Sequence, residues 1–152
     1  MVAPERQSPT GDGLMVLLVD RHALFLAALS KVIAENREAE VEITTSSEQA
    51  LEMLAERPVD LIICELRSEP VAGPELVTRA RQLNPTIRGV LLADPEDAEA
   101  LVEALSSGAV GFFTKDASPE EFLEGIEAVL AGHFVVGRNV VRSTPDDAAS
   151  IN

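Results

Sequence analysis

Three apolar runs, each ending in a charged residue, constrain the fold of this chain more than any other feature. They read MVLLVD at residues 15–20, LIICE at residues 61–65 and FFTK at residues 112–115. Continuous apolar runs of this length, separated by helical patterns, are typical of parallel strands buried on both faces. In open α/β sheets, ligands collect at the carboxyl ends of the strands. The sequence therefore directs Asp20, Glu65 and Lys115 toward one crevice.

The segments between these runs predict a regular alternation of strands and helices. Strands are expected at residues 15–20, 41–45, 60–65, 87–92 and 110–114, and helices at residues 22–35, 47–57, 74–84, 94–107 and 118–132. Short connections between them favour an α/β fold, a flavodoxin-like (βα)5 doubly wound parallel sheet with strand order 2-1-3-4-5. In that order the first and third strands are neighbours, so Asp20 and Glu65 are expected to meet.

Composition and patterning divide the chain into one domain and two polar ends. Residues 1–13 are expected to be a disordered leader, residues 14–136 the folded domain, and residues 137–152 a C-terminal extension or linker. The leader has no apolar stretch typical of a secretory signal, and no apolar run approaches a membrane span. The single cysteine, Cys64, lies inside a buried strand and fits a reducing compartment. We therefore expect a cytoplasmic protein with no membrane partner.

Charge and motif content exclude several classes of function. The formal net charge of −14 disfavours direct binding to the phosphate backbone of DNA. Neither zinc-ligand spacing nor a glycine-rich phosphate loop is present in the sequence. The chain also lacks a recognisable nucleophile–base pair, so no catalytic residue and no metal ligand set is predicted. The expected protein is not an enzyme, and an unrelated enzyme on a flavodoxin-like sheet is disfavoured.

Three segments resemble the receiver domain of bacterial two-component response regulators, of the NarL/LuxR-type subclass. They are LLVDRHALF at residues 17–25, the stretch 60–73, and GAVGFFTKDASPEE at residues 108–121. The resemblance covers about residues 14–136. It implies two adjacent acids that hold Mg²⁺, an aspartate that accepts phosphate, and a hydroxyl residue that binds the phosphoryl oxygen. It also implies a lysine, retained here as Lys115, and an inward-swinging switch aromatic, retained as Phe112.

The chain departs from this family pattern at three pocket positions. Arg21 stands where the second acid is expected, Glu65 replaces the phosphorylated aspartate, and Ala93 replaces the hydroxyl residue. A guanidinium repels Mg²⁺ and can pair with a carboxylate instead. The charges of Asp20 and Glu65 against Arg21 and Lys115 sum to zero without a metal. We therefore expect no cofactor, with Mg²⁺ binding lost or weak.

These departures predict an atypical receiver that acts as a phosphorylation-independent signalling and protein-interaction module. It is expected to be the regulatory part of a transcriptional regulator, touching DNA only through an output domain outside this chain. Three alternatives remain open. Glu65 could serve as a working phosphoacceptor in a phosphorelay, a stand-alone receiver could bind a small ligand at the altered pocket, or the four charges could form a purely structural ion-pair network.

The first and last helices supply the expected partner surface. The first helix is expected to bury one stripe of residues: Leu24, Phe25, Ala28, Leu29, Val32 and Ile33. Leu26 and Ala27 lie off that stripe, and Phe122 and Val129 lie near the edge of the last helix's stripe, so these four are the candidate dimer contacts. Ordinary packing between the two helices is the alternative. His22 is interpreted as a helix-start residue.

Overall fold

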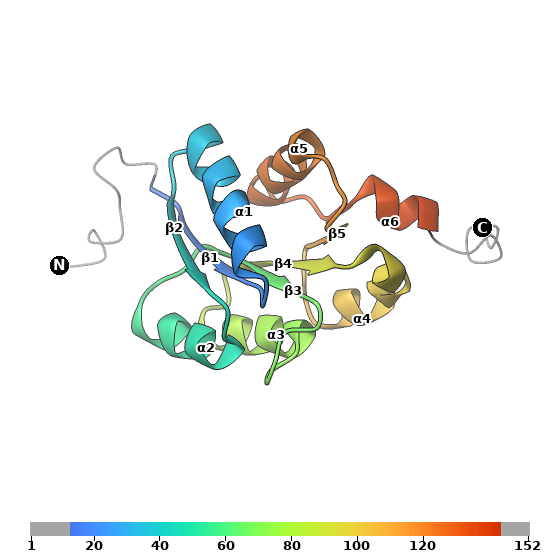
Figure 1. Ribbon diagram of the computed structural model, residues 1–152. Coiled ribbons are helices and arrows are strands. Elements are labelled where there is room, and N and C mark those ends of the chain that lie inside the picture. The colour runs from blue at the N-terminus through green and yellow to red at the C-terminus, as the bar shows by residue number, and fades with distance from the viewer. Residues whose placement is uncertain (1–12, 144–152) are drawn as a thin grey trace.

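A computed structural model of the chain describes residues 13–143 and contains one parallel sheet with helices on both faces (Figure 1). The strands are β1 (Met15–Val19), β2 (Glu40–Thr44), β3 (Leu61–Glu65), β4 (Arg88–Ala93), β5 (Gly111–Thr114) and β6 (Val135–Val136). They lie in the order β2-β1-β3-β4-β5-β6, and every pairing is parallel. The predicted order of the first five strands is confirmed.

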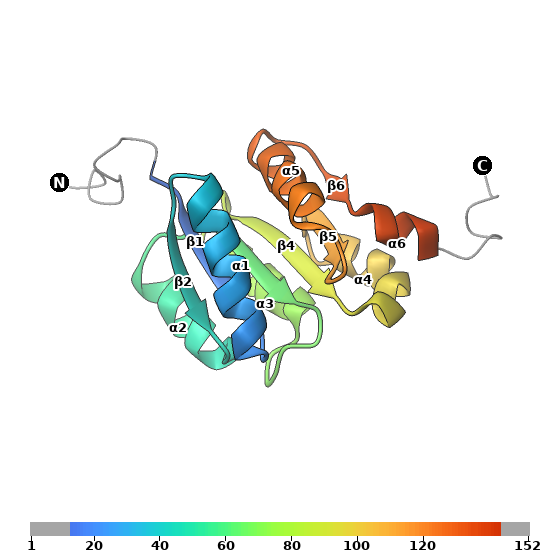
Figure 2. The same ribbon diagram turned by 45° about the horizontal axis from the view of Figure 1, so that its top comes forward.

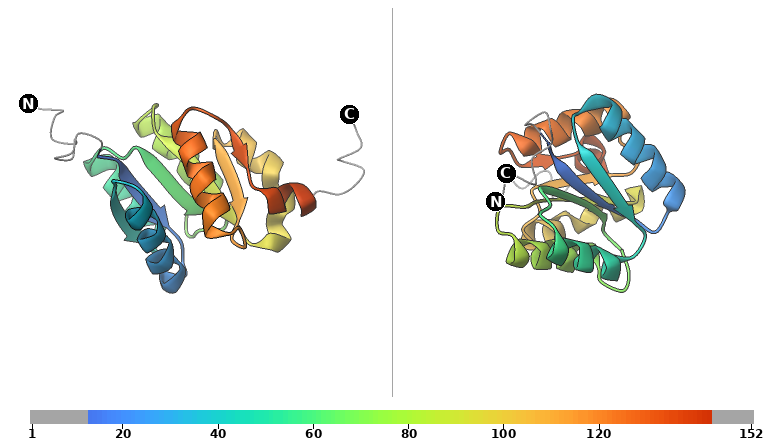
Figure 3. Two further views of the ribbon diagram at one scale, coloured as in Figure 1. Left: turned by 90° about the horizontal axis from the view of Figure 1, so that it is seen from above. Right: turned by 90° about the vertical axis from the view of Figure 1, so that its left-hand side faces the viewer.

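The helices are α1 (Ala23–Asn36), α2 (Ser47–Glu56), α3 (Gly73–Leu83), α4 (Leu101–Ser106), α5 (Pro119–Leu130) and α6 (Arg138–Ser143), with a 3₁₀ segment η2 (Pro95–Ala100) before α4. Figure 2 shows α1 and α5 on one face of the sheet, and the right-hand view of Figure 3 shows the sheet between two helical layers. Alternate strand residues therefore enter different cores. Leu17, Ile62 and Leu91 pack in one buried cluster, and Leu18, Ile63 and Leu92 pack in the other.

The register of the central strands places the predicted charged residues together. Val19 of β1 is paired with Cys64 of β3, so the residues that follow, Asp20 and Glu65, lie side by side at the carboxyl edge. Cys64 is fully buried, as expected for a small core side chain, and burial raises the pKa of its thiol. No described helix between residues 13 and 143 is both long and apolar enough to cross a membrane.

The buried stripe of α1 is a correction to the sequence analysis. Leu26 is only 1% exposed, whereas Leu24, expected in the core, is 85% exposed. Leu26 and Ile33 form the buried face, seven residues apart as two helical turns require. Phe25, Leu29 and Ile33 pack toward the core as predicted, but Leu24 and Leu26 were assigned wrongly. Apolar side chains surround most of this helix, so its periodicity fits two neighbouring stripes about equally well.

The same correction applies to three of the four candidate dimer contacts. Leu26, Phe122 and Val129 are buried in the core cluster between the sheet and the α1–α5 layer. Phe122 packs edge-on against Phe113, with ring centroids 5.4 Å apart. Only Ala27 is exposed. Leu26, Phe122 and Val129 therefore hold α1 and α5 to the sheet and are not available to a partner.

Two further elements differ from the predicted pattern. The helix expected over residues 94–107 is interrupted, because Asp97 has non-helical backbone angles (φ −103°, ψ 17°) inside η2, which precedes α4. The extension predicted at residues 137–152 is folded in its described part, where α6 packs against η2 and β5. A two-residue strand and a six-residue helix are too short for periodicity to reveal. Residues 1–12 and 144–152 lie outside the described residues.

The position of Leu26 predicts a large difference between two leucines of one helix. Leu26→Ala removes a buried side chain and should lower the free energy of unfolding by about 2–5 kcal/mol. Leu24→Ala, the matched control, removes an exposed side chain and should change it by less than about 0.5 kcal/mol. Urea denaturation followed by circular dichroism measures both values. Equal effects would contradict the buried stripe described above.

Candidate functional site

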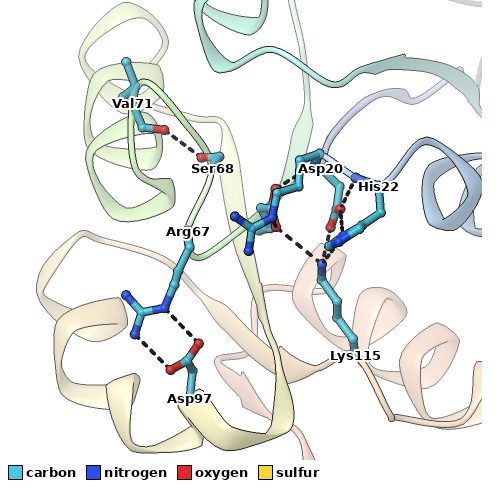
Figure 4. Close-up of polar contacts among 9 residues, drawn as sticks. Asp20, His22, Arg67, Ser68, Val71, Asp97 and Lys115 are labelled. Carbon is cyan, nitrogen blue, oxygen red and sulfur yellow. Dashed lines mark hydrogen bonds and ion pairs between the residues drawn. The ribbon is translucent and has the colours of Figure 1, made fainter.

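Two buried carboxylates and one lysine form the centre of the site. Asp20 follows β1 and is 1% exposed, and Glu65 ends β3 and is 3% exposed. Lys115 follows β5 and reaches back across the carboxyl edge of the sheet (Figure 4). Its Nζ lies 2.7 Å from Asp20 Oδ2 and 3.4 Å from Glu65 Oε1. One ammonium thus contacts two carboxylates that neighbouring strands bring together, and it balances one of their two negative charges.

Arg21 contributes its backbone and its side chain to the Glu65 carboxylate. The backbone N–H of Arg21 donates to Glu65 Oε2 over 2.6 Å. The guanidinium Nε lies 3.4 Å from Glu65 Oε1, the same oxygen that faces Lys115. Both Glu65 oxygens therefore already have cationic or N–H partners, as the neutral charge count in the sequence suggested.

His22 is closer to the pocket than the sequence analysis expected. Its backbone N–H donates to Asp20 Oδ1 over 2.8 Å, and its ring Nδ1 lies 3.0 Å from the same oxygen. Ligand-type atoms of Asp20, His22 and Glu65 all lie within 4.8 Å of one another. The Lys115 Nζ is also 3.4 Å from His22 Nδ1, so it lies close to all three. The lysine ammonium takes the central position in this trio.

A bidentate ion pair lies at the mouth of the pocket. Arg67 Nε donates to Asp97 Oδ2, and Arg67 Nη2 donates to Asp97 Oδ1, each over 2.9 Å (Figure 4). The hydrogen bonds from Arg67 lower the pKa of Asp97, and Asp97 raises the pKa of Arg67. The sequence analysis did not identify this pair, because its members are separated by 30 residues and no local spacing relates them.

Little space remains between these charges. A cavity of about 10 Å³ is bordered by Arg21, Glu65, Arg67, Ala93 and Asp97, among others. That volume holds no more than about one water molecule. Ala93 ends β4 and is buried, so a methyl group stands where the family resemblance implies a hydroxyl.

Phe112 and a neighbouring apolar cleft complete the surroundings of the site. Phe112 is buried in the cluster that also contains Ala93. A second cavity of about 160 Å³ lies between α1 and α5. It is lined mainly by apolar side chains, among them Phe25, Leu29 and Phe122, and Lys115 Nζ lies 5.0 Å from the centre of the Phe25 ring. The predicted pocket residues are therefore together, whereas Phe112 lies within the core behind them.

Removal of the central ammonium should destabilise the whole domain. Lys115→Met leaves two buried carboxylates without their shared cation, and should lower the free energy of unfolding by about 3–5 kcal/mol. Adding Glu65→Gln to that variant should recover part of the loss, because only one buried charge then remains. Lys31→Met, on the exposed face of α1, is the control and should have almost no effect. Equal stability of the two lysine variants, measured by chemical denaturation, would rule out this role for Lys115.

The ion pair at the mouth should make a pH-dependent contribution to stability. Because Asp97 has a folded-state pKa below its ordinary value of 3.8, its contribution is present above that pH and is lost as the pH falls through the lowered pKa. Arg67→Ala should therefore lower the melting temperature near pH 7, with the difference from the native chain shrinking as the pH falls through the lowered pKa of Asp97. In an Asp97→Asn background, the same substitution should have little effect at either pH. A difference that persists unchanged at low pH would contradict this assignment.

Comparison with known proteins agrees with the fold described above. A family model described as the response regulator receiver domain matches residues 16–127. The transcriptional activator protein ExaE of Pseudomonas putida is 32% identical over 122 residues, covering 80% of this chain and 57% of that protein. The nitrate/nitrite response regulator protein NarL of Escherichia coli (strain K12) is 28% identical over 137 residues, covering 90% of this chain and 62% of NarL. The chain thus spans about three fifths of these relatives.

Solved structures show the same fold. A LuxR-family two-component response regulator from Aurantimonas sp. SI85-9A1 superposes with a TM-score of 0.80 at 21% identity, covering 90% of this chain and 98% of that one. A LuxR-family DNA-binding response regulator from Silicibacter pomeroyi gives a TM-score of 0.71 at 26% identity, covering 82% of this chain and 98% of that one. With an edge that gathers Asp20, Glu65 and Lys115 and a family match over most of its folded part, this chain belongs to the response regulator receiver domain family.

Proposed function

We propose that this receiver domain is a signalling and protein-interaction module that works without aspartyl phosphorylation. The observation that carries the proposal is the Lys115 ammonium, which lies between the Asp20 and Glu65 carboxylates at 2.7 and 3.4 Å. In this arrangement the pocket is neutral through its own side chains. The conformation of the pocket is then controlled by ion pairs within the chain and by partner proteins.

The residues present do not fit the Mg²⁺ ion that the family resemblance implies. Mg²⁺ requires a near-octahedral set of oxygens at about 2.0–2.1 Å. Here Asp20 and Glu65 offer carboxylates, but Lys115 is already in contact with both, and Arg21 occupies the place of the second acid. A divalent cation would have to displace one cation and tolerate another. The electrostatics therefore favour a pocket that excludes the metal.

Phosphoryl transfer is disfavoured for the same reasons. Such transfer depends almost entirely on positioning and on stabilisation of charge on the phosphoryl oxygens. Both Glu65 oxygens are engaged, Ala93 has no hydroxyl to donate, and the space beside them is about 10 Å³. The Arg67–Asp97 pair also borders this space. A phosphorelay through Glu65 is therefore the weaker candidate function.

We further propose that the domain regulates an output domain outside this chain. The relatives reported above are longer regulators, and the name of ExaE describes it as a transcriptional activator. The formal net charge of −14 supports a division of labour in which this domain does not itself contact DNA. Its own partners would then be proteins, including a second copy of the same domain.

If the domain self-associates, the α1–α5 face is the interface that we propose. Its contact residues differ from those expected from the sequence. Leu24, Ala27 and Ala28 are exposed on α1, and Ala28 lines the apolar cleft between α1 and α5. Exposed apolar groups next to such a cleft favour a partner contact. Leu26, Phe122 and Val129 support this face only from within the core.

If this face dimerises, Ala27→Glu should convert a dimer into a monomer, because it places a charge in the contact without disturbing the core. The measurement is the molar mass in solution from light scattering coupled to size-exclusion chromatography. Val102→Glu, an exposed position on α4, is the matched control and should leave the mass unchanged. A native chain that is monomeric across the concentration range, or a dimer that persists in Ala27→Glu, would exclude this interface.

Phosphorylation independence is tested by intact mass spectrometry after incubation with acetyl phosphate and Mg²⁺. The native chain should gain no phosphate, because Lys115 and Arg21 occupy the cation positions and Glu65 is already paired. The triple variant Arg21→Asp, Glu65→Asp, Ala93→Thr restores the family pattern and should become labelled, which shows that the assay works. A stable phosphate on the native chain that disappears in Glu65→Gln would overturn the proposal and favour the phosphorelay.

A further inference from the structure

The C-terminal helix α6 packs on the domain through one deeply buried side chain. Val140 is 0% exposed and belongs to the same buried cluster as Phe112, Ala93 and Ala98. Its neighbour Val141 is 61% exposed. Figure 1 shows α6 at the end of the sheet next to β5, and its closest packing partners are η2 and β5. A six-residue helix cannot persist through its own hydrogen bonds, so its position depends on this docking.

A polar link joins α6 to the segment that carries Lys115. Asn139 Nδ2 donates to Asp116 Oδ1 over 3.0 Å, and the hydroxyl of Thr114 donates to the same oxygen over 2.5 Å. Thr114 and Asp116 are the two residues that flank Lys115. The hydrogen bonds from Thr114 and Asn139 hold the pKa of Asp116 below its usual range. The backbone segment that carries Lys115 and the first turn of α6 are therefore joined through the Asp116 carboxylate.

A second link connects the pocket to α6 through η2. Arg67 lies two residues beyond Glu65, and its bidentate pair with Asp97 holds η2 in place. Asp97 is the residue whose non-helical backbone interrupts η2. Because α6 packs on η2, a change at Glu65 that moves Arg67 would alter the surface on which α6 rests.

A third contact fixes the beginning of α6. The backbone N–H of Arg138 donates to Glu121 Oε2 over 2.6 Å. Glu121 belongs to the first turn of α5, where its own N–H donates to the hydroxyl of the helix-capping residue Ser118. The carboxylate thus bonds to the start of α6 and fixes where this helix begins.

We propose that α6 is a displaceable helix whose docking is controlled from the pocket through the Arg67–Asp97 and Asp116–Asn139 links, so that its release transmits the state of the pocket to the chain that follows. The coupling uses ion pairs, hydrogen bonds and the packing of α6 on η2. This proposal goes beyond the proposed function, because it holds whether the conformation of the pocket is controlled by phosphate, by a partner or by neither.

The rate of thiol modification at position 140 measures this docking directly. The native chain has one cysteine, Cys64, which is fully buried and whose thiol has a raised pKa, so it should not react in the folded protein. Val140→Cys introduces a second thiol that a maleimide can reach only when α6 is released. Val141→Cys, at an exposed position of the same helix, gives the reference rate for an accessible thiol. Val140→Cys should react at least about tenfold more slowly than Val141→Cys.

Each link is then removed in the Val140→Cys background. Asn139→Ala should raise the modification rate about tenfold, because it removes a hydrogen bond to a charged carboxylate. Arg67→Ala, which is far from α6 in sequence, should raise it about threefold or more through η2. The matched control is Arg79→Ala, which breaks an exposed ion pair with Glu75 on α3 and should leave the rate unchanged. Circular dichroism melts confirm that every variant is folded at the temperature of the assay.

Three results would overturn the proposal. Equal rates for Val140→Cys and Val141→Cys would show that α6 is not docked. A rate unchanged within about twofold in Arg67→Ala would show that the pocket does not control α6. An equal increase in Arg79→Ala would show that the effect is general destabilisation. Should Asn139→Ala fail to fold, Asp116→Asn removes the same charge-assisted bond with an isosteric side chain and carries the same expectation.

Discussion

The structure depends on one ammonium group held between two buried carboxylates. A parallel sheet in this strand order forces the ends of β1 and β3 together, so Asp20 and Glu65 must share a small, mostly dry volume. Two such charges are costly without a counterion. Lys115 provides it from β5, two strands away from Glu65, by crossing the end of β4, where Ala93 adds little bulk. Together with Arg21, this contact balances the charge of the pocket, and the proposed exclusion of a metal rests on it.

The sequence predicted the sheet and the pocket because both depend on long, buried runs with charged ends. A continuous apolar run such as the one at residues 61–65 predicts a strand that is buried on both faces. The charged residue at its end is then expected at the edge of the sheet. The same reasoning failed for α1, where Leu24 and Leu26 exchanged their expected environments. In a helix with apolar residues on most sides, the sheet decides which stripe is buried, and local periodicity does not. For three of the four proposed dimer contacts, the structure gives a role in the core.

Other features could not be predicted because they join segments that are distant in sequence. The Arg67–Asp97 pair interrupts an otherwise regular helix start, and it forms only when the loop after β3 meets the loop after β4. Likewise, α6 is too short to be recognised alone and gains its position from Val140 and from Asp116. These tertiary contacts surround the pocket on the side toward η2 and α6. The Arg67–Asp97 pair and α6, which the sequence did not predict, are thus the elements that would carry a signal out of the pocket.

The central claim is that Lys115 and Arg21, and not a divalent cation, neutralise Asp20 and Glu65. Titration of the isotopically labelled chain with Mn²⁺, a paramagnetic substitute for Mg²⁺, tests this most directly through the broadening of amide signals. The account predicts no selective broadening at Asp20, Arg21 or Glu65, while the same titration of the Arg21→Asp, Glu65→Asp double variant broadens them. Selective, saturable broadening of those amides in the native chain would show that a metal displaces Lys115, and would contradict the account.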